Sequence, residues 1–85
     1  MPDSVHIGLY RPADDLTTGL KVASTDRTAA LKGLCEYLLE IIDDEELDTV
    51  GLARTDPRDD DLLQALSRIV EAWGAEAALV EVPLT

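Results

Sequence analysis

The chain has 85 residues, 46% of them hydrophobic, and it carries 18 acidic against 7 basic side chains, a net charge of −11 at pH 7. This length allows one domain over residues 1–85 with a small core, and no apolar run approaches the roughly 20 residues of a membrane span. The negative charge disfavours direct binding to nucleic acid or to an anionic membrane, and it makes a basic protein the expected partner.

The N-terminus and the cysteine content bear on the cellular compartment. The first four residues, MPDS, lack the basic start and the apolar segment of a signal peptide, so we expect a cytoplasmic protein. The single cysteine, Cys35, agrees with this expectation, because one thiol makes neither an internal disulfide nor a four-thiolate zinc or iron–sulfur site.

The first predicted element is a strand over residues 4–10, SVHIGLY. Its apolar residues alternate with other types at the period of a half-buried strand. We expect the apolar set to face the core and the set between them to face away. The first set is Val5, Ile7 and Leu9, and the second is His6, Gly8 and Tyr10.

A hairpin is predicted next. Residues 11–18, RPADDLTT, carry proline and paired aspartates and indicate a surface loop. Residues 19–24 form a second predicted strand, with Leu20 and Val22 facing the core, and it is expected to pair antiparallel with the first.

The first helix is predicted to begin at Asp26, which follows Thr25 and serves as N-cap. Apolar residues then recur three and four positions apart as far as Ile42. We expect the helix to end near Asp43, because the acidic run that begins there would oppose the helix dipole at a C-terminus.

A strand, a helix and another strand complete the predicted fold. Residues 49–54, TVGLAR, are predicted as a strand, and Asp56 and Pro57 as the N-cap and first position of a helix whose apolar stripe ends before Gly74. A strand over residues 77–82 follows. Such a unit with short connections is a right-handed crossover between parallel strands.

The sequence therefore predicts an α/β two-layer sandwich in the order β-β-α-β-α-β, with a four-stranded mixed sheet and two helices on one face. The other face of the sheet would be open. An open sheet face is either solvated or covered by a partner, and of these two we expect a protein partner or a second copy of the chain, in a homodimer, to bind there. The expected contact residues are His6, Tyr10, Lys21 and Thr49.

Two acidic runs form the expected acidic surface of the protein. Neither run has the alternating oxygens and the glycine turn of a calcium loop, so we expect solvated clusters at helix ends and no metal or cofactor. The runs are Asp43, Asp44, Glu45 and Glu46, and Asp59, Asp60 and Asp61.

Three arginines are expected at the edge of the sheet where the two predicted strand-to-helix turns meet. Arg27, Arg54 and Arg58 could bind a small anion there, since helix N-termini favour anions at such an edge. The stronger expectation is that Asp26 and Asp56 cap helices and that neighbouring carboxylates pair with these arginines, because no glycine-rich turn admits a phosphate.

Catalysis is not expected. Cys35 lies on the apolar stripe of the first helix, whereas a reactive thiolate needs exposure and a positive neighbour. His6 has no second histidine with which to share a metal, and no strained elbow presents a serine.

The resulting hypothesis is a non-enzymatic acidic protein-interaction module or inhibitor that binds a basic protein surface, in its sharper form a nucleic-acid mimic of phage or regulatory type. Two alternatives stay open. One is a small accessory domain of a halophile, whose acidity is an adaptation to solvent. The other is a small-anion-binding or enzymatic module that uses the three arginines.

Overall fold

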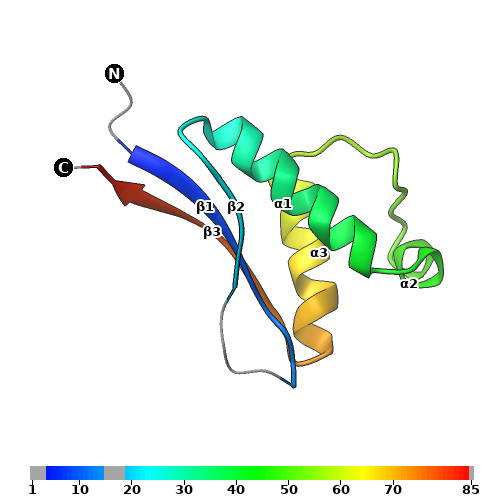
Figure 1. The fold of residues 1–85 in the computed structure, drawn as a ribbon. Coiled ribbons are helices and arrows are strands. Elements are labelled where there is room, and N and C mark those ends of the chain that lie inside the picture. The colour runs from blue at the N-terminus through cyan, green and yellow to red at the C-terminus, as the bar shows by residue number, and fades with distance from the viewer. Residues whose placement is uncertain (1–3, 15–18, 85) are drawn as a thin grey trace.

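The computed structural model describes residues 4–14 and 19–84, and Figure 1 shows a sheet with helices on one side of it. The sheet is three-stranded and antiparallel, in the order β2-β1-β3, and α1 and α3 pack against it. Residues 15–18 of the predicted loop lie outside the described residues. The elements are β1 (Ser4–Arg11), β2 (Gly19–Ser24), α1 (Arg27–Ile41), α2 (Asp44–Thr49), α3 (Asp60–Ala72) and β3 (Glu76–Pro83).

The α/β class and the antiparallel hairpin of β1 and β2 are confirmed, but the four-stranded mixed sheet is wrong. The expected strand over residues 49–54 does not form. Thr49 is the last residue of α2, Val50 is its C-cap, and Gly51 follows with a φ of +76°. Consequently β3 returns beside β1 in the antiparallel sense, and the order is β-β-α-α-α-β.

The acidic run after α1 explains the extra helix. Asp43 accepts a hydrogen bond of 3.0 Å from the Glu46 backbone N–H, so it is the N-cap of α2. The next three residues, all acidic, occupy the first turn of α2, where carboxylates complement the helix dipole. The run does follow the end of α1, as predicted, but it stabilises the start of the next helix.

Capping side chains decide where α1 and α3 begin. Asp26 caps α1 as predicted, with its carboxylate accepting from the Thr28 N–H at 3.0 Å. The predicted cap of α3 is wrong: Asp59 accepts from the Leu62 N–H at 2.9 Å, while the Asp56 carboxylate accepts from the Ala53 N–H within the preceding loop. The helix therefore starts three residues later than expected.

Glycine at two positions lets α1 approach the sheet closely. A Cβ at Gly8 of β1 would clash with the Val22 side chain and would come within 3.1 Å of the Leu34 Cβ. A Cβ at Gly33 of α1 would lie 2.8 Å from Val22. Most of the buried hydrophobic residues belong to the helices. The largest fully buried side chains are Leu34, Leu38, Ile42, Leu47, Leu66, Val70 and Cys35.

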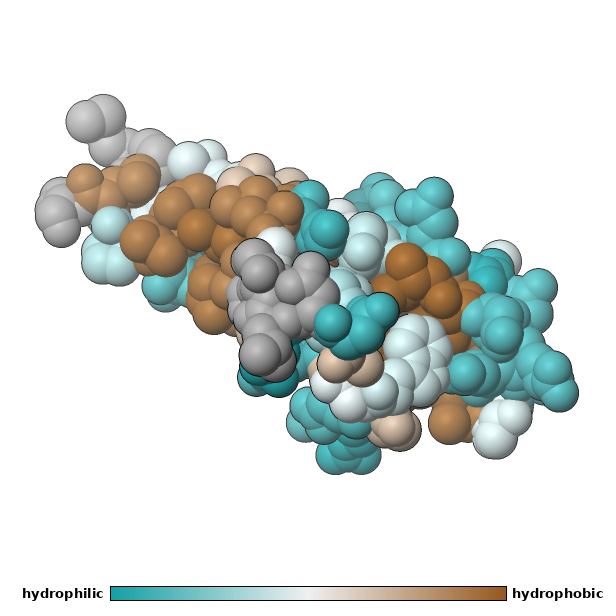
Figure 2. Space-filling model, turned by 60° about the horizontal axis from the view of Figure 1, so that its bottom comes forward, coloured by the Kyte–Doolittle hydropathy of each residue, from teal (hydrophilic) through white to brown (hydrophobic). Residues whose placement is uncertain are grey.

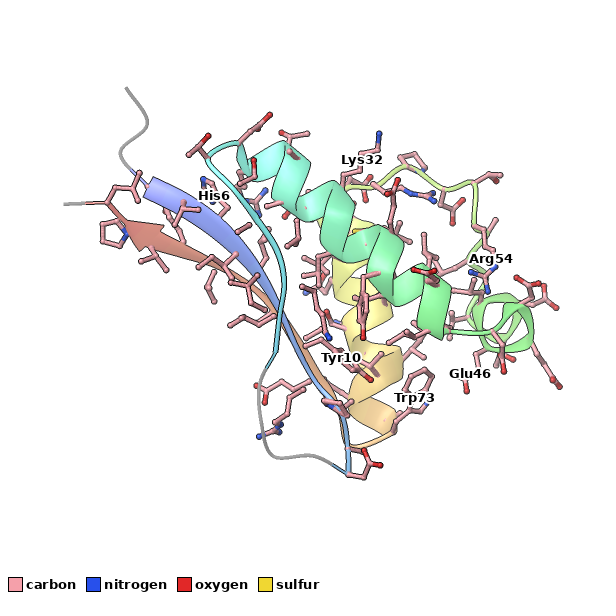
Figure 3. All side chains as sticks on the ribbon, viewed as in Figure 1. His6, Tyr10, Lys32, Glu46, Arg54 and Trp73 are labelled. Carbon is pink, nitrogen blue, oxygen red and sulfur yellow. The ribbon has the colours of Figure 1, made fainter. Side chains whose placement is uncertain are left out.

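This close approach reverses the two faces of β1 relative to the prediction. Gly8 and Tyr10 are the buried residues of the strand, and the Tyr10 side chain lies on the side of the helices (Figure 3). Its ring centre is 5.5 Å from that of Tyr37 on α1. Burial raises the pKa of the Tyr10 hydroxyl, and the neighbouring Tyr37 adds to the effect. The residues expected in the core, among them Ile7 and Leu9, lie on the opposite face.

A bulge in β2 reverses the facing of Leu20 as well. Gly8 pairs with Val22 but Leu9 pairs with Leu20, so Lys21 is an extra residue on β2. The Lys21 ammonium lies 5.1 Å from the centre of the Tyr37 ring, on the helix side of the sheet. Leu20, which was expected in the core, is 59% exposed.

Candidate functional site

The four residues expected on the open face of the sheet are not there. His6 and Tyr10 share the helix-facing side of β1 with Gly8, and Lys21 contacts Tyr37 of α1. Thr49 belongs to α2, where its hydroxyl donates to the Glu45 carbonyl at 2.9 Å. The correction has three causes: the inverted facing of β1, the bulge at Lys21 of β2, and the absence of the expected strand at Thr49.

The three arginines are engaged in separate contacts. Arg27 makes a two-point hydrogen bond to Asp60, at 2.5 and 3.2 Å, which lowers the pKa of that carboxyl. Arg54 donates to the Leu39 and Ile42 carbonyls at the end of α1 and also pairs with Asp44.

Arg58 completes this set with two bonds to carbonyls of its own loop. Its guanidinium donates to the Arg54 carbonyl at 2.6 Å and to the Asp56 carbonyl at 2.7 Å. The Arg54 side chain, by contrast, caps α1 by satisfying carbonyls that a helix end leaves without partners. The three guanidinium groups thus support local structure and leave no shared concave anion site.

The remaining candidates for chemistry are the thiol of Cys35 and the side chains able to bind a metal. Cys35 is fully buried, and this burial raises the pKa of its thiol from 9.0 to about 11. Within residues 4–14 and 19–84, no group of three or more histidine, cysteine and acidic side chains is arranged to hold a metal ion. In the same part of the chain, no helix is long and apolar enough to cross a membrane.

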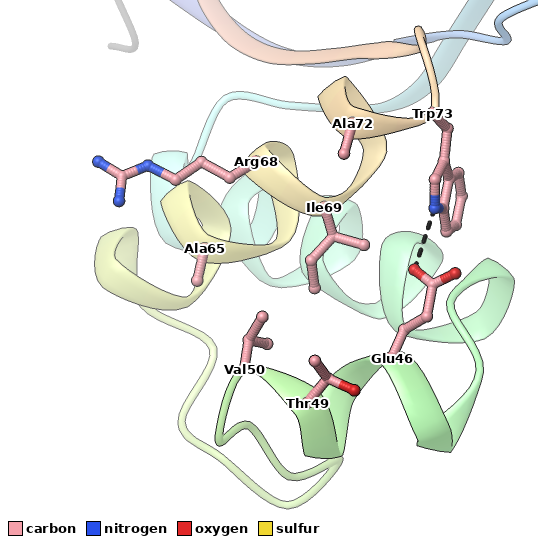
Figure 4. A pocket seen from close by; sticks show the side chains of 8 residues that line it. All are labelled: Glu46, Thr49, Val50, Ala65, Arg68, Ile69, Ala72 and Trp73. Atoms are coloured by element: carbon pink, nitrogen blue, oxygen red, sulfur yellow. Dashed lines mark hydrogen bonds between the residues drawn. The ribbon is translucent and has the colours of Figure 1, made fainter.

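A groove lies between α2 and α3. Its volume is about 540 Å³, and Figure 4 shows the side chains that line it. One wall comes from α2 and its C-cap, and the other comes from one face of α3, where residues three and four positions apart share a side. The lining residues are Glu46, Thr49, Val50, Ala65, Arg68, Ile69, Ala72 and Trp73.

A hydrogen bond between Trp73 and Glu46 closes one end of this groove. The indole Nε1–H donates to Glu46 Oε2 at 3.0 Å and so joins the end of α3 to α2 (Figure 4). The lining is otherwise mainly apolar, and Val50 is 53% exposed within it. Arg68 extends its guanidinium away from Glu46, so the carboxylate is not neutralised by the cation in the lining.

Besides the groove, the face of the sheet that points away from the helices is uncovered, and it is here called the open face. Figure 2 shows apolar residues gathered at the strand end of the molecule and hydrophilic ones over the opposite end, where α2 lies. The strand register gives its members. They are Val5, Ile7, Leu9 and Arg11 of β1, Leu20 and Ala23 of β2, and Glu76, Ala78, Val80 and Val82 of β3.

Comparisons with known proteins found no significant match. No family model matches this chain, and neither a curated protein nor a solved structure matches it significantly. The groove and the open face are therefore interpreted from their geometry and chemistry alone.

The groove was missed at the sequence level because its two walls are 15 or more positions apart in the chain. Glu46 and Thr49 were singled out, but for an acidic cluster and a strand. The apolar stripe predicted to end before Gly74 has Trp73 as its last residue, whereas Trp73 is the C-cap residue of α3 and is 36% exposed. One available signal was the single tryptophan standing directly before Gly74, at the end of a helix rather than in its middle.

Proposed function

We propose that this protein is a non-enzymatic interaction module that binds a basic, amphipathic segment of a partner protein in the groove between α2 and α3. The supporting observation is the composition of the groove, whose exposed apolar wall carries a carboxylate and an aromatic ring at one end. A segment with apolar and cationic side chains matches both parts of such a site.

The apolar part of the groove supplies contact area. Val50 offers an exposed branched side chain, Ile69 is a core residue that is only 9% exposed, and Ala65 and Ala72 are small enough to leave room above α3. A volume of about 540 Å³ falls within the range of small binding sites, roughly 300 to 1,000 Å³. It accommodates a few side chains of a helix or an extended segment, which is what helix-in-groove recognition requires.

The charged part of the groove selects for a cation. Glu46 accepts one hydrogen bond from Trp73 and keeps acceptor capacity for a lysine or arginine. The Trp73 ring beside it can contact the same cation through its face. With a net charge of −11, the protein attracts a basic segment before contact is made, and salt weakens that attraction.

The sharper hypothesis of a nucleic-acid mimic receives less support from the acidic side chains. Such a mimic would present free carboxylates in place of phosphates. Asp43 and Asp59 instead cap helices, and Asp44 and Asp60 pair with arginines. The anion-binding alternative is weakened by the same contacts, because they also occupy the arginines.

The halophile alternative predicts a different response to salt. If the acidity is an adaptation to solvent, the fold itself should need molar potassium chloride. Thermal unfolding in low and in molar salt tests this, and a midpoint that does not rise with salt counts against the halophile.

The binding proposal is tested with a designed amphipathic helical peptide of leucine and lysine, and with a leucine–glutamate peptide as the negative control. Because Trp73 is the only tryptophan, its fluorescence and its indole N–H signal report on the groove directly. We expect saturable binding of the lysine peptide that weakens between about 0.05 and 0.5 M salt.

Two variants locate the binding. Glu46→Gln should weaken the lysine peptide about three- to tenfold, since it removes one partly exposed charge contact. Glu36→Gln is the matched control, because it removes the same charge from an exposed position on α1. Equal affinities of the two variants, or binding that is indifferent to salt, would contradict the proposal.

A further inference from the structure

We infer that the open face of the sheet is the interface of a homodimer, in which a second copy of the chain packs its own open face against it. This inference does not depend on the groove, which lies on the other side of the helical layer. It concerns a surface that the helices leave entirely uncovered.

Register and packing place these apolar side chains outside the core. Val5, Ile7 and Leu9 pair with Val82, Val80 and Ala78, so the six share one face. None of them packs against the buried cluster, whereas their chain neighbours Ala77 and Leu79 do. Val80 and Val82 are 37% and 41% exposed. On β1 the branched side chains of Val5, Ile7 and Leu9 therefore lie on the face away from the helices, and Gly8 lies on the face toward them.

Charge decides in favour of a second copy over a basic partner. At the register positions of the open face, the charged residues are Arg11 and Glu76, which form an ion pair of 3.0 Å with each other. The face is thus neutral, although the chain carries −11 overall. The only carboxylate that a basic protein would meet at these positions is that of Glu76, and Arg11 already pairs with it. A second copy can pack on the face without bringing net charges together.

The size of the face suits a small symmetric interface. Two strands of eight residues and one of six, rising about 3.3 Å per residue and spaced about 4.8 Å apart, cover roughly 350 Å² in projection. That is within the range of roughly 300 to 600 Å² for the largest apolar patch on a monomer, a class of patch that is often functional. It is about half of the roughly 800 Å² per partner of a standard interface. We therefore expect a dimer that dissociates on dilution.

The layered shape of the subunit is compatible with face-to-face packing of the two sheets. The Cα atoms extend 42 × 30 × 15 Å, so the subunit is thin along one direction. Two sheets packed face to face at about 10 Å would give four layers, with helices outside and both sheets inside. Such an interface is self-complementary, and the central strand β1 of each copy would lie near the two-fold axis.

The oligomeric state of the full chain tests the inference. Sedimentation equilibrium over a range of concentrations should show a monomer–dimer equilibrium. Higher salt should strengthen the dimer, because salt screens the repulsion between two acidic subunits while the interface itself is apolar. The peptide affinity of the groove responds to salt in the opposite sense, so the two proposals can fail separately.

Val80→Asp should weaken the dimer at least tenfold, since it places a charge in the middle of the apolar face. Ala29→Asp is the matched control, as it adds the same charge at an exposed position of α1. Val80→Thr keeps a β-branched side chain and should weaken the dimer less, and it serves as the test if Val80→Asp fails to fold. Circular dichroism checks the fold of each variant.

Each result decides. A wild-type chain that stays monomeric at high concentration overturns the inference and leaves the face to another kind of partner. A dimer that persists unchanged in both Val80 variants overturns it too, because the copies would then meet elsewhere, for example along the edge of β2 or β3. Loss of the dimer in the Val80 variants alone supports it.

Discussion

The two faces of the sheet differ in hydropathy, and from hydropathy alone the wrong face would be expected to be buried. The face covered by α1 and α3 contributes Gly8 and Tyr10 from β1, and the open face contributes Ile7 and Leu9. The side with more aliphatic surface is the uncovered one. Because Gly8 has no side chain, α1 can pack close to the backbone of β1 and make many contacts with it. Close packing of this kind favours burial of the glycine face.

This difference means that the same kind of substitution should have different consequences on the two faces. Changes on the covered face should alter folding of the single subunit. Changes on the open face should leave the subunit intact and alter what it associates with. The following predictions test this division, beginning with the largest effect.

Leu34→Ala should lower the free energy of unfolding by about 2–5 kcal/mol. Leu34 is fully buried on α1 directly above Gly8, so the substitution leaves a cavity between helix and sheet. Urea unfolding of the monomer measures the loss. A loss below about 1 kcal/mol would show that the covered face is not closely packed.

Gly8→Ala should lower the free energy of unfolding by about 1–3 kcal/mol through overpacking. The added methyl group would meet Val22 and Leu34, and α1 would have to move outward. Gly19→Ala is the control in the same sheet, because a Cβ there has its nearest neighbour at 3.6 Å. Equal stabilities of the two variants would contradict the close approach of α1.

Alkaline pH should destabilise the fold through Cys35. Burial holds the pKa of the thiol at about 11 in the folded protein, above its ordinary value of 9.0. Between these values the unfolded chain loses a proton that the folded chain keeps, so the free energy of unfolding should fall as pH rises from 9 to 11. Below pH 9 this contribution is constant.

Urea unfolding across that pH range measures the effect, and Cys35→Ala provides the comparison. The variant should lose this part of the pH dependence even if its overall stability is lower. An identical alkaline slope in both proteins would indicate that the thiol is not shielded.

Val82→Thr should change the stability of the monomer by no more than about 0.5 kcal/mol, the smallest of these effects. The side chain is exposed and lies on the open face. Thermal unfolding at a concentration where the protein is monomeric measures it. A loss comparable to that of Leu34→Ala would mean that the open face is covered within one subunit.

The sequence was sufficient to predict elements whose signals are local. The helical spacing and the Asp26 cap predicted α1, and the C-terminal strand and the stop at Gly74 were also found. The role of Asp43 as N-cap of α2 was not predicted, because an acidic run is found both after the end of one helix and at the start of another. The residues that follow it, with Gly51 at positive φ, were consequently assigned to a strand.

The candidate groove could not be predicted, since its walls come together only when Trp73 reaches Glu46 across 27 positions of the chain. The arginines gave the opposite error. They were expected to share one edge of a mixed sheet, and without the extra strand Arg54 bonds to the end of α1.

By itself, the sequence determined the helix and strand segments with strong periodicity, the acidity of the surface and the existence of two unlike faces on the first strand. The tertiary structure alone decided which of these faces is covered and how the last strand pairs. The physical reason is that the alternation of residue types along a strand separates its two faces but does not show which face is buried. That choice depends on how near a helix can come, and here the absence of a side chain at Gly8 allowed the approach.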